Sequence, residues 1–194
     1  MTAPRSASRQ RRTKETNVTV RLALDGSGTG DVGTGLPFLD HLLVALALHA
    51  RFDLEVKATG DLEVDAHHTV EDVALVLGET LAEALGDRWG IVRFGDAIVP
   101  LDESRATVAL DCGGRGYAVI DVPLQGKAIG SLPASLVPHF LETLAARGGV
   151  TLHVTALGRD DHHLAEASFK ALARALRQAC AIDPSLRGGR SSTK

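Results

Sequence analysis

The residues best suited to chemistry in this sequence form the pattern His-His-x-x-Glu, which is present at residues 67–71 and again at residues 162–166. On an α-helix, residues four apart lie on one face, whereas the next residue along is turned by about 100°. His67 and Glu71 can therefore share one metal ion, while His68 must point elsewhere. Imidazole and carboxylate groups are common metal ligands. The pattern thus indicates a helix that gives two ligands to one ion and one ligand to another.

A single histidine on a helix is more often structural, and one His-His pair alone is a weak sign of a metal site. Repetition of the whole pattern strengthens the metal interpretation. The apolar positions that follow the two motifs also correspond, so both helices are expected to carry the same buried stripe. These positions are Val70, Ala74, Leu77, Gly78 and Leu81 in the first copy, and Ala165, Phe169, Leu172, Ala173 and Leu176 in the second.

The duplication extends towards the N-terminus of each motif. His41 and His139 each stand 19 positions before a glycine, Gly60 or Gly158, and the first copy is then three residues longer before its double histidine. A difference in length is tolerated best in a connection between elements. Six of the eight histidines belong to this duplicated set, and His49 is one of the two that do not.

Composition excludes several classes of protein. At 194 residues and 44% hydrophobic, the chain can bury a core without help from metals or disulfides. The net charge of −3 and the lack of a basic patch in the body argue against a nucleic-acid partner. The exception is a basic run, Arg5 to Lys14, which we expect to be a mobile N-terminus.

No apolar run is long enough to span a bilayer, and no signal-type apolar segment follows the basic run, so we expect a cytoplasmic protein without a membrane partner. Cys112 and Cys180 have neither paired-thiol spacing nor a secretory context. We therefore expect both cysteines to be free.

Each half predicts several strands, a helix, a strand and a final helix, which indicates an α+β fold of tandem duplicated half-domains. We expect four helices packed between two four-stranded sheets, with the first half at residues 1–92 and the second at 93–194. Expected helices cover residues 39–49, 67–86, 138–146 and 162–180. Expected strands cover residues 16–24, 52–58, 62–64, 106–110, 117–122 and 150–156, with a loop at 126–133.

Several further segments, taken together and in order, resemble the imidazoleglycerol-phosphate dehydratase family over nearly the whole chain. They are residues 13–16 (Thr-Lys-Glu-Thr), 35–41 (Gly-Leu-Pro-Phe-Leu-Asp-His), 67–72 (His-His-Thr-Val-Glu-Asp), 93–96 (Arg-Phe-Gly-Asp), 100–104 (Pro-Leu-Asp-Glu-Ser), 161–163 (Asp-His-His) and 192–194 (Ser-Thr-Lys).

The resemblance implies the step of histidine biosynthesis that converts D-erythro-imidazole-glycerol phosphate to imidazole-acetol phosphate and water. It also implies the ribosomal protein S5 domain 2-like fold and two Mn²⁺ ions per active site. One ion would take His41, His68, His162 and Glu166, and the other would take His67, Glu71, His139 and His163. Zn²⁺, Fe²⁺ and Co²⁺ suit the same donors.

Roles for the substrate follow from the resemblance as well. Glu15 would transfer a proton, although hydroxyl binding alone is the alternative, and His49 would contact the substrate unless it is only a cation at a helix C-terminus. Substrate-binding positions would be Glu15, His41, His49, His67, His68, Glu71, Arg93, Arg115, His162, Ser192, Thr193 and Lys194. The resemblance also implies a homo-oligomer of 24 subunits built from trimers, with sites completed between neighbours.

Two other classes of protein satisfy part of this pattern. A different di-metal enzyme, such as a hydrolase that uses metal-bound water, would need the ligands but neither Glu15 nor the Ser-Thr-Lys segment. A metal-storage protein would need only the histidines and glutamates. Metal-dependent formation of imidazole-acetol phosphate distinguishes the dehydratase from both.

Overall fold

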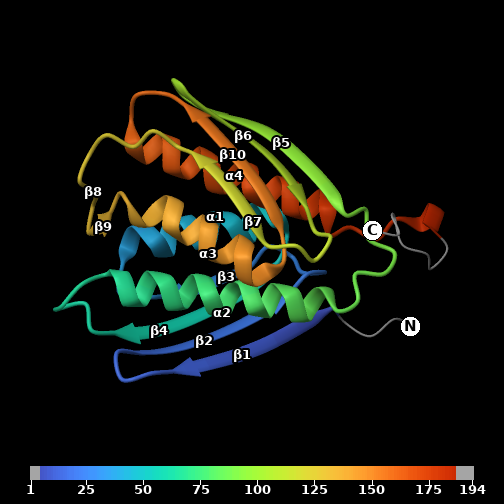
Figure 1. Cartoon of the computed structure of the whole chain (residues 1–194), viewed down its shortest axis with the longest axis horizontal. Helices are drawn as coiled ribbons and strands as arrows, with labels where there is room; N and C mark the ends of the chain where they lie inside the picture. The colour runs from blue at the N-terminus through green and yellow to red at the C-terminus, as the bar shows by residue number, and fades with distance from the viewer. Residues whose placement is uncertain (1–4, 187–194) are drawn as a thin grey trace.

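The computed structural model describes residues 5–186 and places four helices between two four-stranded sheets (Figure 1). The first sheet has the strand order β1-β2-β4-β3 and the second has the order β5-β6-β10-β7. Each sheet comes from one half of the chain, which confirms the α+β prediction with duplicated halves. The boundary that we propose between residues 92 and 93 lies in the connection from α2 to β5.

The strands alternate buried and exposed residues because one face of each sheet covers the helices and the other faces solvent. In the first sheet the strands are β1 (Ser6–Arg12), β2 (Thr16–Ala23), β3 (Gly30–Gly33) and β4 (Asp53–Gly60). In the second they are β5 (Phe94–Leu101), β6 (Ser104–Asp111), β7 (Tyr117–Asp121) and β10 (Thr151–Leu157). Both sheets contain one parallel pair, β3 with β4 and β7 with β10.

The four predicted helices are confirmed with small shifts of their ends. They are α1 (Pro37–Ala50), α2 (His67–Leu85), α3 (Leu136–Gly148) and α4 (Asp161–Ala179). Helix α2 packs against α3 and against β1 and β2, while α4 packs against α1 and against β5 and β6. The helices thus form the middle layer, and their shared core includes the fully buried rings of Phe140 and Phe169, whose centroids lie 5.5 Å apart.

The expectation of a mobile basic N-terminus was wrong for most of that run. Residues 6–12 form the edge strand β1, which pairs antiparallel with β2. Arg9 bonds to Glu79 and Glu83 of α2, and Arg11 bonds to Asp72 of the same helix. Ion pairs therefore hold this strand against α2. Its polar and charged side chains give no apolar alternation, which is the pattern by which a strand is recognised in a sequence.

Other local expectations need correction. The predicted strand at residues 62–64 is a turn, closed by the backbone N–H of Val64 donating to the carbonyl of Asp61. The predicted loop at residues 126–133 contains a small hairpin formed by β8 (Ala128–Ile129) and β9 (Leu132–Pro133). Strands β3 and β5 were not predicted. Strand β3 has only four residues, of which Val32 alone is strongly apolar, and pairing with another strand decides such short strands.

Two further expectations can be compared with the structure. Cys112 and Cys180 are both free and buried, as predicted. Among residues 5–186, no helix has both the length and the apolar character that crossing a membrane would require.

Candidate metal centre

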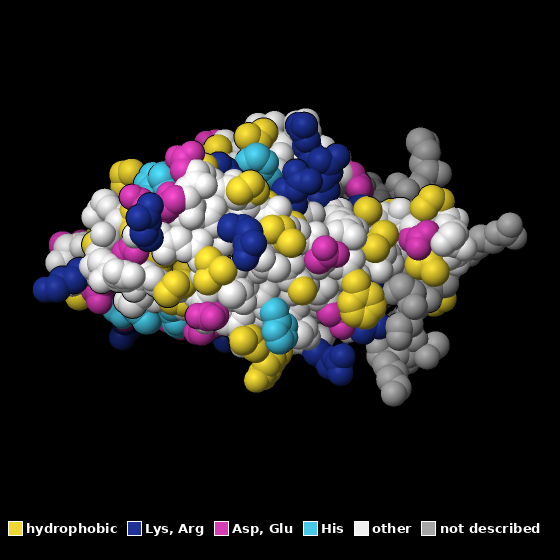
Figure 2. Space-filling model, turned by 90° about the horizontal axis from the view of Figure 1, so that it is seen from above, with side chains coloured by type: hydrophobic (Ala, Val, Ile, Leu, Met, Phe, Trp, Pro, Cys, Tyr) yellow, Lys and Arg dark blue, Asp and Glu magenta, His cyan; other side chains and the backbone are white. Residues whose placement is uncertain are grey.

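The two His-His-x-x-Glu motifs lie at the N-terminal ends of α2 and α4. Asp160 caps α4, since its carboxylate accepts hydrogen bonds from the backbone N–H groups of His162 and His163 at 2.9 and 3.2 Å. Asp65 accepts one from the N–H of His67 at 3.2 Å. Figure 2 shows histidine and acidic side chains close together towards the end of the molecule at which α2 and α4 begin. The helix starts therefore present the candidate ligands on one end of the fold.

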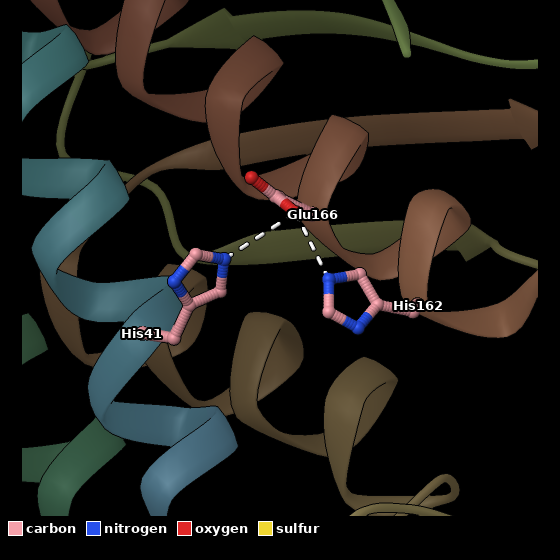
Figure 3. Close-up of side chains that lie close together, drawn as sticks. All are labelled: His41, His162 and Glu166. Carbon is pink, nitrogen blue, oxygen red and sulfur yellow. Dashed lines mark hydrogen bonds and ion pairs between the residues drawn. The ribbon is translucent and has the colours of Figure 1, made fainter. Parts of the chain in front are cut away.

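The first cluster joins α1 to α4 through His41, His162 and Glu166 (Figure 3). Glu166 Oε2 lies 3.3 Å from His41 Nε2 and 3.1 Å from His162 Nε2. Burial raises the pKa of Glu166, but the hydrogen bonds from Lys170 and His41 outweigh it and leave the pKa at about 2. Glu166 is therefore a charged carboxylate at neutral pH, which is the form that binds a metal cation.

The second cluster joins α2 to α3 through His67, Glu71 and His139. His67 Nε2 lies 3.6 Å from Glu71 Oε2, and His139 Nε2 lies 3.7 Å from Glu71 Oε1. The imidazole rings of His67 and His139 face each other with centroids 4.9 Å apart. His139 Nε2 is buried, yet it has no hydrogen-bond partner among the described residues.

Both clusters fit a metal ion. In each of them the ligand atoms all lie within 4.8 Å of one another. A buried imidazole nitrogen without a hydrogen-bond partner among the described residues, such as His139 Nε2, is costly unless a ligand satisfies it. Two imidazoles and one carboxylate suit Mn²⁺, Fe²⁺, Co²⁺ or Zn²⁺. The chemistry of the donors thus agrees with two metal sites in each chain.

His68 and His163 take no part in the clusters of their own chain. The Nδ1 atom of His68 lies 3.1 Å from Asp61 Oδ2, and the Nδ1 atom of His163 lies 2.8 Å from Glu103 Oε2. These hydrogen bonds to carboxylates raise the pKa of both histidines. The structure therefore brings together three of the four ligands predicted for each ion, and the helix-face argument correctly separates His68 from His67.

Glu15 lies in the tight turn between β1 and β2, where Thr13 Oγ1 accepts hydrogen bonds from the backbone N–H groups of Glu15 and Thr16. It is exposed and lines a hollow of about 370 Å³ together with Asp61 and Glu63. Within residues 5–186, its carboxylate has no hydrogen bond or ion pair. Its negative charge is nevertheless close enough to His68 to raise the pKa of that imidazole slightly further.

Arg93 and Arg115 lie together at Asp111, away from the clusters. Arg93 donates from Nε and Nη2 to the two oxygens of Asp111 at 2.7 and 2.9 Å, and Arg115 Nη2 is 3.8 Å from Oδ2 of the same carboxylate. The backbone N–H of Arg93 donates to the carbonyl of Ala179, the last residue of α4. Because α4 runs from Asp161 to Ala179, this end lies roughly 20 to 26 Å along the helix axis from the motif residues His162 to Glu166. One chain does not bring these arginines to its own clusters.

His49 occupies the last turn of α1, facing α4. Burial lowers the pKa of His49, and the nearby Lys170 and Arg174 lower it further against an opposing effect of Glu166. The lowered pKa disfavours a cation at the helix C-terminus, and contact of His49 with the substrate stays a prediction. The other predicted phosphate ligands, Ser192, Thr193 and Lys194, lie outside the described residues.

No role was predicted from the sequence for four charged residues whose side chains contact those of the predicted ligands, namely Asp61, Asp102, Glu103 and Lys170. Lys170 follows Glu166 by one helical turn, and Nζ lies 2.7 Å from Glu166 Oε1, so its spacing was a usable signal. Glu103 lies in one of the segments that carry the family resemblance. Asp61 directly follows the repeated Gly60. Their contacts depend on how separate elements pack, which spacing along the chain does not specify.

The comparison with protein-family models matches residues 34–176 to the family described as imidazoleglycerol-phosphate dehydratase. Two curated relatives carry the same name. The protein from Methanoculleus marisnigri is 53% identical over 190 residues, which is 98% of both chains. The protein from Acidiphilium cryptum is 51% identical over 191 residues, covering 98% of this chain and 97% of the relative.

Solved structures give the same result for the fold. The imidazoleglycerol-phosphate dehydratase of Staphylococcus aureus matches with a TM-score of 0.83 and 30% identity, covering 91% of this chain and 99% of that one. The crystal structure of IGPD from Pyrococcus furiosus matches with a TM-score of 0.78 and 35% identity, covering 93% and 99%. The similarity therefore includes both halves of the duplicated fold.

Proposed function

Because this chain belongs to the imidazoleglycerol-phosphate dehydratase family, its reaction is the removal of water from D-erythro-imidazole-glycerol phosphate in histidine biosynthesis, and we propose that two metal ions and Glu15 carry it out. The observation that supports this most directly is the pair of three-residue clusters at one end of the helical layer. The product is imidazole-acetol phosphate.

Each cluster would hold one ion, with a fourth ligand from a neighbouring copy of the chain. In this proposal His68 of a neighbour completes the cluster of His41, His162 and Glu166, and His163 of a neighbour completes the cluster of His67, Glu71 and His139. The support is that both histidines turn away from their own clusters and are oriented by separate carboxylates. We propose Mn²⁺ as the metal, because three imidazoles and one carboxylate leave octahedral positions open, which suits this ion.

When bound, the two cations supply positive charge that makes the imidazole ring of the substrate a better electron acceptor. The residues of the chain then have distinct tasks. The hydrogen that leaves is on the middle carbon of the glycerol chain, and the exposed carboxylate of Glu15 takes it as a proton. The hydroxyl on the carbon next to the ring takes up a proton and leaves as water, which gives an enol. The enol becomes the ketone when a proton returns to the carbon next to the ring.

The phosphate would be held by Arg93, Arg115, Ser192, Thr193 and Lys194. Asp111 keeps the guanidinium of Arg93 in place through two hydrogen bonds, and Arg115 is free to turn because 76% of its side chain is exposed. Guanidinium groups bind phosphate oxygens with paired hydrogen bonds. The length of α4 separates these arginines from the metal clusters of the same chain, so phosphate and imidazole must be bound by different copies.

That separation supports a homo-oligomer as the active form, and we propose the 24-subunit assembly of trimers implied by the family. We also propose the cytoplasm as its compartment, as expected from the sequence. A first experiment is to strip the metal and measure dehydration with and without added Mn²⁺. Turnover restored by Mn²⁺ would support the proposal, whereas no turnover from the folded, assembled and metal-loaded protein would contradict it.

The role of Glu15 is tested by Glu15→Gln, with Glu63→Gln as the matched control because both residues line the same hollow. A general base contributes roughly 10²- to 10⁴-fold to the rate. We expect Glu15→Gln to lose turnover to about this extent while it retains its metal content and substrate binding. Glu63→Gln should behave as the wild type. Full activity of Glu15→Gln would remove the assignment.

A further inference from the structure

Two carboxylates contact the motif histidines that the clusters leave out. Asp61 Oδ1 and Oδ2 lie 3.2 and 3.1 Å from His68 Nδ1, and Glu103 Oε2 lies 2.8 Å from His163 Nδ1. We propose that Asp61 and Glu103 are positioning residues, which fix each imidazole so that its Nε2 atom is the one offered to a metal ion. This inference rests on the proposed function.

The tautomer follows from the chemistry of the pair. An ionised carboxylate can only accept a hydrogen bond, so the Nδ1 atom facing it must carry the hydrogen. The lone pair of the neutral imidazole is then on Nε2, which is the atom that can bind a metal. In His163 this atom lies 3.7 Å from Asp102 Oδ2. Carboxylates that orient metal-binding histidines in this way typically contribute about 10- to 100-fold to metal affinity.

Glu103 is itself held firmly by three donors. Its Oε1 atom accepts from the hydroxyl of Ser104 at 2.7 Å and from the backbone N–H groups of Asp160 and Arg159 at 3.0 and 3.2 Å. These bonds leave Oε2 pointing at His163. Gly158 permits this arrangement, because a Cβ atom there would lie 2.0 Å from the Ser104 hydroxyl. The carboxylate is therefore fixed before any metal binds.

The duplication relates Glu103 to Glu15. Thr16 opens β2 and pairs with Gly60, while Ser104 opens β6 at the place where Gly158 approaches it. Glu15 and Glu103 directly precede these two residues, each in the hairpin turn before its strand. The two glutamates thus hold equivalent positions in the two halves.

The residue that follows the repeated glycine is Asp61 in the first half and Arg159 in the second. This difference explains why the two histidines contact different carboxylates. Arginine has no acceptor atom, so His163 is bonded by Glu103 instead. In the first half Asp61 bonds to His68, and Glu15 has no such partner in the described part of the chain. Asp61 therefore also keeps Glu15 available for proton transfer.

The test measures Mn²⁺ binding to the whole assembled protein by calorimetric titration, with Co²⁺ absorption spectra as a second readout of the ligand environment. The variants are Glu103→Gln and Asp61→Asn, and Glu63→Gln is the matched control because its side chain is exposed in the same connection as Asp61. We expect each of the first two variants to bind one of its two ions about 10- to 100-fold more weakly. Glu103→Asp, which restores the charge, should recover part of the loss.

Binding of both ions by Glu103→Gln and Asp61→Asn as tightly as by Glu63→Gln would overturn the inference. A variant that loses both ions and also loses the circular dichroism spectrum of the folded protein would overturn the inference as well, because the carboxylates would then be structural. Wild-type protein that binds two ions but does not dehydrate the substrate would contradict the proposed function and leave the positioning roles standing. Wild-type protein that binds neither ion would overturn both.

Turnover at saturating Mn²⁺ tests the second part of the inference. Glu103→Gln should recover its kcat once both ions are bound, because Glu15 is untouched. Asp61→Asn should not recover, since Glu15 would turn to His68 as its equivalent Glu103 does to His163. Equal recovery of kcat by both variants would show that Asp61 does not keep Glu15 free.

Discussion

Replacing Asp111 with asparagine should destabilise the protein through Arg93. The two side chains are only 13% and 9% exposed, and the guanidinium donates two hydrogen bonds to the carboxylate. Removing one partner of a buried pair costs about 3–5 kcal/mol, because the other charge is left without compensation. Asparagine keeps one acceptor oxygen, which retains about 1 kcal/mol. We therefore expect Asp111→Asn to lose roughly 2–4 kcal/mol of unfolding free energy.

The assay is urea-induced unfolding of metal-stripped protein at neutral pH. The matched control is Glu55→Gln, which removes the partner of Arg21 from a pair whose side chains are 34% and 64% exposed. An exposed pair of this kind contributes about 0–1 kcal/mol. A loss from Asp111→Asn no greater than that from Glu55→Gln would refute the reasoning about burial.

The same comparison has a defined pH dependence. The hydrogen bonds from Arg93 hold the pKa of Asp111 below its ordinary value in the folded protein. A carboxyl group with a lowered folded pKa contributes its full stability above its unfolded pKa of about 3.9, and loses that contribution as the pH falls through the folded pKa. The difference between wild type and Asp111→Asn should be constant from about pH 7 to 5 and shrink below about pH 4. A difference that stays unchanged down to about pH 2 would contradict the assigned cause.

Three other substitutions give independent tests. Glu71→Gln should lower the bound metal, measured by elemental analysis, from two ions per chain to one, because Glu71 belongs to only one cluster. Phe140→Ala should cost about 3–5 kcal/mol in denaturant unfolding, since the ring is fully buried against Phe169. Arg115→Ala should raise KM for the phosphorylated substrate and leave unfolding within about 0.5 kcal/mol of wild type, because its side chain is 76% exposed. Unchanged metal content, stability or KM, respectively, would contradict these expectations.

The helices were predictable because their information is local. Ligands at i and i+4, followed by an apolar stripe, define both the face and the extent of α2 and α4. The same periodicity correctly separated His68 from His67 and Glu71. Edge strand β1 was missed because ion pairs to α2 hold it in place, and charged residues give no alternating apolar signal.

The sequence by itself determined the duplication, the four helices and the histidines and glutamates able to bind metal, since each of these depends on spacing along one chain. Spacing alone did not pair His41 of α1 with Glu166 of α4 or His139 of α3 with Glu71 of α2; the family resemblance implied these pairs, and the tertiary structure brings them together. Only the tertiary structure decided that Asp61 and Glu103 hold the two remaining motif histidines. The physical reason is that contacts between separate elements depend on how helices and sheets pack around a common core, and residue spacing within one element does not contain that information.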